Sequence, residues 1–208
     1  LAAALREGRT LPENVVCITF DDGFADNAEA LGACAERGLP ASVFVTTGYV
    51  GRPCMLDARG LRELAALPGA EIGSHTVTNR RLDELPRREI ARELTDSRAA
   101  LEDALSREVT TIAYPHGNYD RRVLELAAVA GYRGGAAVRM ATARSTDPHL
   151  AVARYIVSAV TSESLLRRLV AGALPGAPSG ERLRTRGFRL ARRTRAFVRP
   201  VVATPPVP

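Results

Sequence analysis

Near its N-terminus the chain reads Val15-Val16-Cys17-Ile18-Thr19-Phe20-Asp21-Asp22-Gly23-Phe24. The first six residues are uncharged and mostly β-branched or aromatic, a composition typical of a strand buried on both faces. Two carboxylates and a glycine end this run, which places the acids at the carboxyl end of the strand. Parallel α/β sheets carry their chemistry at that end. We therefore predict that this stretch is the centre of the molecule.

The adjacent carboxylates of Asp21 and Asp22 repel each other. Such a pair is tolerable when a metal ion neutralises one charge and the other carboxylate is free to take a proton. An Asp-Gly turn after a strand is the alternative for the dipeptide alone. A second stretch favours the metal, because residues 71–82 place His75 and Asn79 four positions apart after another short strand.

Taken together, the two stretches resemble the polysaccharide deacetylase family, also called NodB-like or carbohydrate esterase family 4. The resemblance covers most of residues 10–170. Its markers, in chain order, are Thr19-Phe20-Asp21-Asp22-Gly23, Ser74-His75-Thr76 and Tyr114-Pro115-His116-Gly117. Three ordered motifs are far more specific than any one alone. The resemblance implies an α/β fold, an incomplete or distorted (β/α) barrel.

The pattern of apolar segments independently favours a parallel sheet, because strands alternate with helices. Five or six such units that close on themselves suggest a barrel. A short helix and a turn are expected within residues 1–14. The expected strands are residues 15–20, 41–47, 70–74, 109–114, 134–138 and 152–157. The expected helices are residues 25–37, 58–67, 86–106, 120–130 and 162–171, with Pro86 in the first turn of the third and Asp120 as the N-cap of the fourth.

The chain has 208 residues, of which 46% are hydrophobic, as expected for one domain with a sizeable core. We place this domain at residues 1–172, followed by a Pro/Gly linker and an arginine-rich tail at residues 173–208. The formal charge is +6. Residues 181–208 hold eight arginines and one glutamate, a charge of +7, which leaves −1 for the rest. The predicted domain is therefore nearly neutral.

The tail could attract anionic polymers, nucleic acid or membrane phosphates. A solvated helix, limited by Gly187 and Pro200, is the interpretation we favour, so no nucleic-acid partner is expected. No apolar run reaches the roughly 18 residues of a membrane span, and the start of the chain lacks a signal-peptide pattern. We expect the three cysteines to be free and to act as small buried hydrophobes. Together these observations favour the cytoplasm.

The resemblance implies roles for three of the singled-out residues. Asp22 and His75 would bind a divalent metal, most plausibly zinc, with cobalt or nickel as alternatives. Asp21 would be the general base that takes a proton from the attacking water. A metal with only three protein ligands keeps positions open for water and substrate, which is a catalytic arrangement.

The chain departs from the family at position 79, where the second metal-binding histidine would stand and Asn79 is found. An amide oxygen can bind a metal, but more weakly than imidazole binds zinc. Three explanations stay open: Asn79 is a ligand in a variant subgroup, the site has lost its metal, or the residue was changed from a natural histidine.

The third motif, Tyr114-Pro115-His116, would form the substrate and oxyanion side of the site. By resemblance the backbone N–H of His116 faces the oxyanion. Its imidazole could also act as the acid for the departing amine, although a histidine that only lines a groove is the alternative. Some family members have an arginine two residues before the proline, where this chain has Ala113. Arg154 could replace it from elsewhere, or be a surface arginine. The family's late Leu-x-His motif is missing, and His149 has no assigned role.

The resemblance thus implies a metal-dependent hydrolase that removes N-acetyl groups from an N-acetylated amino sugar, in a polysaccharide or a smaller glycoside, and releases acetate. The alternative is a catalytically weakened or inactive carbohydrate-binding homologue, because of Asn79.

Overall fold

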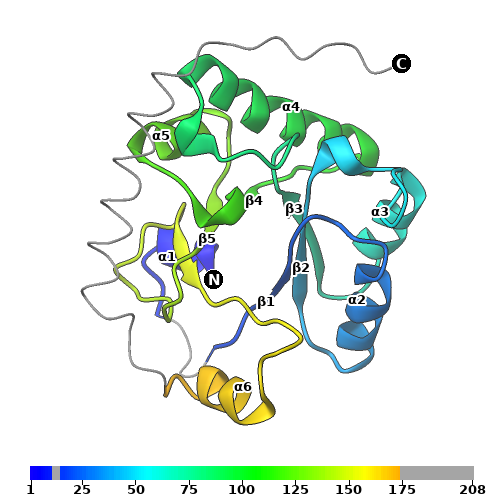
Figure 1. The fold of residues 1–208 in the computed structure, drawn as a ribbon, viewed down its shortest axis with the longest axis vertical. Coiled ribbons are helices and arrows are strands. Elements are labelled where there is room, and N and C mark those ends of the chain that lie inside the picture. Colours follow the sequence, from blue (N-terminus) through cyan, green and yellow to red (C-terminus); the bar gives the residue numbers. More distant parts are fainter. Residues whose placement is uncertain (11–14, 174–208) are drawn as a thin grey trace. The chain divides into compact units, whose positions relative to one another are not determined.

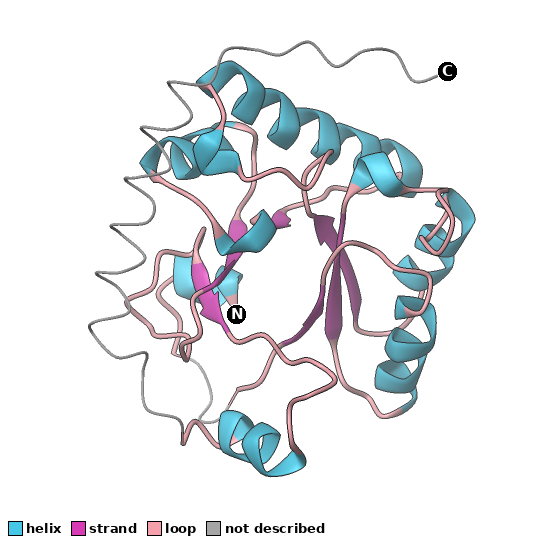
Figure 2. Cartoon of the chain, viewed as in Figure 1, coloured by secondary structure: helices cyan, strands magenta, loops and turns pink. Residues whose placement is uncertain are grey.

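Six parallel strands form one curled sheet in the computed structural model, which describes residues 1–10 and 15–173 (Figures 1 and 2). The strands are β1 (Ile18–Phe20), β2 (Ala41–Val45), β3 (Ala70–Ser74), β4 (Thr111–Ala113), β5 (Gly134–Val138) and β6 (Val152–Arg154). Their order in the sheet follows their order in the chain, which leaves β1 and β6 as the two edges. The prediction of an incomplete (β/α) barrel is confirmed.

Helices connect most of the strands and cover the outside of the curled sheet (Figure 2). The α-helices are α1 (Ala2–Arg6), α2 (Asn27–Glu36), α3 (Ala58–Ala65), α4 (Arg87–Leu105), α5 (Arg121–Val129) and α6 (Glu163–Val170). Short 3₁₀ turns follow β2, β3 and β4, namely η1 (Thr47–Tyr49), η2 (Leu82–Glu84) and η3 (Pro115–Gly117). These connections make successive strands parallel, so all their carboxyl ends lie at one edge of the sheet.

The long helix α4 shows how the sequence builds the core. Ile90, Leu94 and Leu101 recur at helical spacing and are almost completely buried. Pro86 is its N-cap residue rather than part of its first turn. The next helix, α5, begins as predicted, because the Asp120 carboxylate accepts a hydrogen bond from the backbone N–H of Val123 at 3.1 Å.

The first strand is shorter than the sequence suggests. Val15 and Val16 are 45% and 52% exposed, and Cys17 is exposed as well. The reason is the pairing register: Ile18 is opposite Ala41, the first residue of β2, so the residues before it have no partner in that strand. Residues 15–17 therefore lie outside the paired part of the sheet, where they are exposed. The last strand likewise ends at Arg154 rather than at residue 157.

The exposure of the cysteines differs from the prediction that they are small buried hydrophobes. All three are free, but Cys17 and Cys54 are exposed and Cys34 is half-buried. Their predicted role as buried hydrophobes is therefore wrong for two of them. For Cys17 the error follows from the overestimated length of the first strand, because Cys17 precedes the paired part of β1. Cys54 lies in the loop between η1 and α3.

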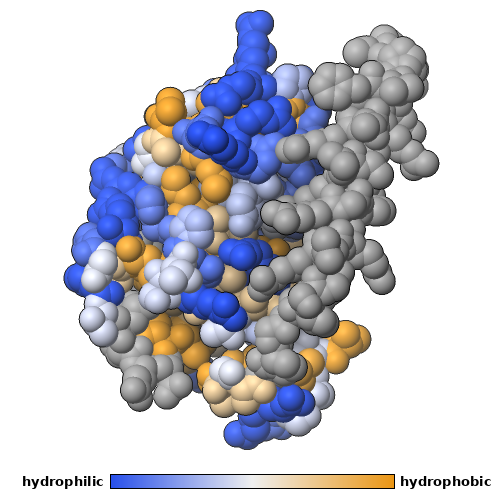
Figure 3. Space-filling view, turned by 90° about the vertical axis from the view of Figure 1, so that its left-hand side faces the viewer, coloured by the Kyte–Doolittle hydropathy of each residue, from blue (hydrophilic) through white to orange (hydrophobic). Residues whose placement is uncertain are grey.

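Several hydrophobic side chains reach the surface. Figure 3 shows hydrophobic residues among hydrophilic ones on one side of the molecule. Within the described residues, no helix has both the length and the apolar character needed to cross a lipid bilayer. The linker and arginine-rich tail that we predict at residues 173–208 fall, apart from residue 173, outside the described part of the chain.

Candidate active site

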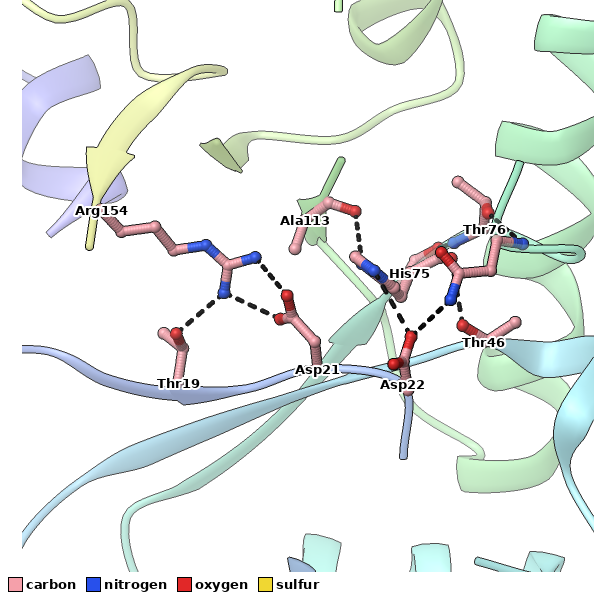
Figure 4. A network of polar contacts seen from close by, with 10 residues as sticks. Thr19, Asp21, Asp22, Thr46, His75, Thr76, Ala113 and Arg154 are labelled. Carbon is pink, nitrogen blue, oxygen red and sulfur yellow. Dashed lines mark hydrogen bonds and ion pairs between the residues drawn. The ribbon is translucent and has the colours of Figure 1, made fainter. Parts of the chain in front are cut away.

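Polar side chains from three separate strands meet at the carboxyl edge of the sheet (Figure 4). Asp21 and Asp22 directly follow β1, His75 directly follows β3, and Arg154 is the last residue of β6. Figure 4 shows the two carboxylates pointing in different directions, one toward Arg154 and the other toward His75. The structure thus brings together the acids, the imidazole and the arginine that the sequence singled out.

Arg154 holds Asp21 by a two-pronged ion pair. The terminal nitrogens of Arg154 donate to Asp21 Oδ1 at 2.8 Å and to Oδ2 at 2.6 Å. One of them also donates to the Thr19 hydroxyl at 2.9 Å, and the guanidinium carbon lies 5.6 Å from the centre of the Phe44 ring. The Arg154 side chain is only 15% exposed. Charge-assisted bidentate pairs of this kind fix the orientation of a carboxylate.

His75 is buried, and its hydrogen bond fixes which ring nitrogen carries the proton. Nδ1 lies 2.8 Å from the carbonyl oxygen of Ala113, which can only accept, so Nδ1 carries the hydrogen. Nε2 then presents its lone pair toward Asp22 Oδ1, 3.6 Å away. Burial lowers the pKa of His75, against the opposing effect of the Asp21 and Asp22 charges. The result is a neutral imidazole with a free Nε2, the form that binds metals.

Asn79 also lies beside Asp22 and His75 and is the third candidate metal ligand. Its side-chain Nδ2 donates to Asp22 Oδ1 at 2.7 Å, while its Oδ1 is buried and has no partner in the described residues. A half-turn of the amide about its last side-chain bond exchanges these two atoms, because the oxygen and the nitrogen are nearly the same size. With that half-turn, an oxygen of Asn79, an oxygen of Asp22 and Nε2 of His75 face the same space.

This donor set fits a divalent cation. Among the described residues, no three His, Cys, Asp or Glu side chains are grouped so that they could hold a metal ion. A cation beside Asp22 and His75 therefore needs a donor of another kind, and the unpartnered Oδ1 of Asn79 supplies one. Carboxylate, imidazole and amide oxygen are all established ligands of divalent metals.

Four residues at this edge of the sheet have a left-handed backbone conformation, which is uncommon for residues other than glycine. The φ angles of Asp22, Thr76, Asn79 and His116 are 71°, 67°, 58° and 57°. The left-handed region is uncommon for any residue with a Cβ, and a β-branched residue such as Thr76 is an outlier there. Such conformations cluster at functional sites, where surrounding contacts enforce them.

The third motif, Tyr114-Pro115-His116, at the turn after β4, has two buried residues and one exposed residue. The Tyr114 side chain is completely buried, its ring centre lies 5.5 Å from that of Tyr119, and burial raises the pKa of its phenol. Pro115 is buried too. His116 is exposed in this turn, and its imidazole forms no hydrogen bond or ion pair with Asp21, Asp22 or His75.

Sequence reasoning missed one residue that supports the site, Glu93 of α4. Its carboxylate is almost completely buried and accepts hydrogen bonds from the turn between His75 and Asn79. A signal was present, because Glu93 falls between Ile90 and Leu94 on the apolar face of the helix. A charged residue at a core position needs partners, and here the partners belong to the site.

Comparison with known proteins shows which family of sequences and which solved structures the chain is similar to. The family model described as polysaccharide deacetylase matches residues 8–135. "Putative polysaccharide deacetylase YxkH" of Bacillus subtilis is 29% identical over 155 residues, which cover 74% of this chain and 55% of the relative. A chitooligosaccharide deacetylase of Sinorhizobium fredii is 32% identical over 130 residues, 61% of this chain and 57% of the relative. The chain spans about half the length of the curated relatives it matches.

Solved structures share the fold. The deacetylase PplD of Streptococcus pyogenes, solved with acetate, superposes with a TM-score of 0.75 at 24% identity, over 84% of this chain and 76% of that one. IcaB from Ammonifex degensii gives a TM-score of 0.68 at 24% identity, over 81% and 77% of the two chains. These likenesses agree with the curled sheet of six parallel strands.

Proposed function

The chain belongs to the polysaccharide deacetylase family, and from that premise we propose that it is a metal-dependent hydrolase. The reaction would remove the acetyl group from an N-acetylated amino sugar, in a polysaccharide or a smaller glycoside, and release acetate. The observation that carries this proposal is the meeting of Asp21, Asp22 and His75 at one edge of the sheet. The names of two relatives, a putative polysaccharide deacetylase and a chitooligosaccharide deacetylase, support the choice of acetylated sugars.

Asp22, His75 and Asn79 would hold the metal, most plausibly zinc, with cobalt or nickel as alternatives. A divalent metal bound there would polarise the acetyl carbonyl and lower the pKa of a water molecule. His75 is prepared for this role because its Nδ1–H bond to Ala113 keeps Nε2 free. Asn79 brings a neutral oxygen where the family has imidazole, so we expect weaker zinc binding than in relatives with histidine.

Asp21 would be the general base. Both of its oxygens accept hydrogen bonds from Arg154, which fixes the orientation of the carboxylate. A charged carboxylate can take the proton of the attacking water. Asp22, its neighbour, has no arginine partner among the described residues and faces His75 and Asn79 instead. Two adjacent acids in different environments are suited to two different tasks.

The turn after β4 would stabilise the oxyanion of the tetrahedral intermediate. The backbone N–H groups of Gly117 and Asn118 already donate to the carbonyls of Tyr114 and Pro115. The N–H of His116 is therefore the donor that we propose for the oxyanion, and the buried Tyr114 and Pro115 hold it in place.

The exposed imidazole of His116 can be tested separately as the acid for the departing amine. His116→Gly keeps the N–H and suits the left-handed backbone. If the imidazole is the general acid, His116→Gly should lower kcat by about 10²-fold or more relative to the wild type. If only the backbone N–H matters, kcat of His116→Gly should stay within about tenfold of the wild type.

The main experiment measures acetate release from a panel of N-acetylated glycans and small glycosides, with zinc, cobalt or nickel and with a chelator. We expect release that requires metal and that Asp22→Ala abolishes. An Asp22→Ala protein with full metal-dependent activity would contradict the proposal decisively.

One observation favours a second candidate, a weakened or inactive carbohydrate-binding homologue. The Asn79 amide donates directly to Asp22, so this side of the site can satisfy itself without a cation. Calorimetric titration separates the two candidates. Sugar binding without any binding of zinc, cobalt or nickel at micromolar concentration favours the second one.

A further inference from the structure

Glu93 is a buried carboxylate that binds a turn rather than a cation. It is 7% exposed, and among the described residues it forms no ion pair with an arginine. One of its oxygens accepts the backbone N–H groups of Val77 and Thr78, each at 2.9 Å. The other accepts a short hydrogen bond from the Thr78 hydroxyl. Three donors from two adjacent residues thus compensate one buried negative charge.

The turn that Glu93 binds lies between His75 and Asn79. From the other side, the backbone N–H groups of Thr47 and Gly48 donate to the carbonyls of Thr76 and Val77 at 3.0 and 2.9 Å. The turn is therefore held between α4 and the segment that follows β2. These backbone contacts all hold residues 76–78, which lie between the two proposed metal ligands His75 and Asn79.

The turn also contains strained backbone that external contacts must maintain. Thr76 and Asn79 have φ angles of 67° and 58°. A β-branched threonine rarely adopts this region, so the turn would relax toward another shape if its anchors were removed. Within the turn, the N–H of Asn79 donates to the Thr76 hydroxyl at 3.2 Å. The strained residue is thereby coupled directly to Asn79.

A second polar residue of α4 fixes the start of the same turn. The hydroxyls of Ser97 and Ser74 are 2.8 Å apart, and the N–H of Thr76 donates to Ser74 at 3.1 Å. Ser97 lies one helical turn after Glu93 on the buried face of α4. The helix therefore holds both the entry to the turn and its middle.

We propose that Glu93 is a positioning residue for the cation site: it holds residues 76–78 so that His75 and Asn79 face Asp22. The inference rests on the proposed function in one respect, that Asp22, His75 and Asn79 bind a metal. Its physical content is separate, because it concerns the placement of the Asn79 amide against Asp22. Residues that orient metal ligands through hydrogen bonds typically change metal affinity by about 10–100-fold when they are replaced.

The chemistry of the contacts predicts which replacement restores function. Glutamine can accept both N–H groups with its amide oxygen and donate its NH₂ to the Thr78 hydroxyl, which can accept. Alanine can do neither. We therefore expect Glu93→Gln to bind metal within about threefold of the wild type and Glu93→Ala to bind it about tenfold more weakly or worse. Asp96→Ala is the matched control, because Asp96 is an exposed carboxylate on the same helix.

The experiment titrates the folded proteins with Zn²⁺ alone by calorimetry, and records the NMR signals of the Asn79 side-chain NH₂ before zinc is added. If the wild type binds zinc and Glu93→Ala binds zinc with the same affinity, the inference about Glu93 is overturned and the proposed function stays intact. If the wild type binds no zinc, metal dependence fails instead. The Asn79 signals then decide: a shift or broadening in Glu93→Ala, absent in Asp96→Ala, supports the positioning role, and unchanged signals overturn it.

Thr78→Val provides the same test if Glu93→Ala does not fold. Thr78 is exposed, and valine removes only its hydroxyl at nearly constant volume. We expect a smaller loss of zinc affinity, about threefold to tenfold, and a matching shift of the Asn79 NH₂ signals. Wild-type zinc affinity together with unchanged signals in Thr78→Val would contradict the role of Glu93.

Discussion

Arg154 and Asp21 form a bidentate ion pair that joins the two edges of the sheet, although 133 positions separate them in the chain. Arg154 ends β6 and Asp21 follows β1, and these edge strands do not pair with each other through their backbones. The ion pair therefore bridges the gap between the two edge strands of the incomplete barrel, at the end of the sheet that carries the site. It lies partly outside the family match, which ends at residue 135.

Arg154→Lys is expected to lower kcat by about 10–100-fold with a smaller effect on KM. Lysine keeps the charge but presents one point donor, so it cannot hold both oxygens of Asp21 and the Thr19 hydroxyl at once. Steady-state kinetics on the best substrate of the panel measures the effect. Arg133→Lys is the control, because Arg133 forms an exposed ion pair with Glu108 and precedes β5, so it lies at the amino edge of the sheet, opposite the edge that carries the site. Equal kcat values in Arg154→Lys and the wild type would show that the two-pronged contact is dispensable.

Asn79→His is expected to bind zinc about tenfold more tightly than the wild type, because imidazole is a stronger zinc ligand than an amide oxygen. The backbone should tolerate the change, since histidine is enriched in the left-handed region that Asn79 occupies. Zinc titration by calorimetry measures the difference. Asn79→Ala, which offers no donor, should bind more weakly than either. The same affinity in all three proteins would exclude residue 79 from the metal site.

Much of this site could be predicted from the sequence because its residues directly follow strands. β3 and β5 have the predicted bounds, and His75 therefore stands where the sequence placed it. Arg154 remained one of two alternatives, because no local pattern links it to an acid so far away in the chain. The composition around Val15 and Val16 predicts a buried strand, but composition carries no information about where the pairing with the next strand begins, and both residues are exposed.

Gly117→Ala is expected to destabilise the fold by about 2 kcal/mol or more. The φ angle there is 68°, and a Cβ would lie 2.5 Å from the carbonyl oxygen of Val138 on the next strand. Urea unfolding at constant pH measures the change. Gly32→Ala is the matched control, because Gly32 lies within α2 and an added Cβ meets no atom within 4 Å. That control should be stabilised by up to about 1 kcal/mol. A Gly117→Ala protein as stable as the wild type would mean that the turn Pro115–Gly117, which contains His116, can shift freely.

The stability of the metal-free protein should fall as the pH is lowered from about 6.5 toward the lowered pKa of His75. Burial keeps His75 neutral in the folded state, while the same residue in the unfolded chain takes a proton near its ordinary pKa. In that window the unfolded state binds more protons, so its free energy drops relative to the folded state. The slope contributed by one histidine is at most about 1.4 kcal/mol per pH unit.

Urea unfolding in the presence of a chelator, at pH 7.5 and at several lower values, measures this effect. His75→Gln removes the titrating group while keeping a side chain that can donate to the Ala113 carbonyl. The variant should therefore lose the His75 contribution to the pH dependence, although both proteins share the contributions of the other histidines and the carboxylates. The informative quantity is the difference between the two slopes. Identical slopes below pH 6.5 would mean that the imidazole takes its proton as easily in the folded protein as in the unfolded chain, and that burial does not hold Nε2 ready for a cation.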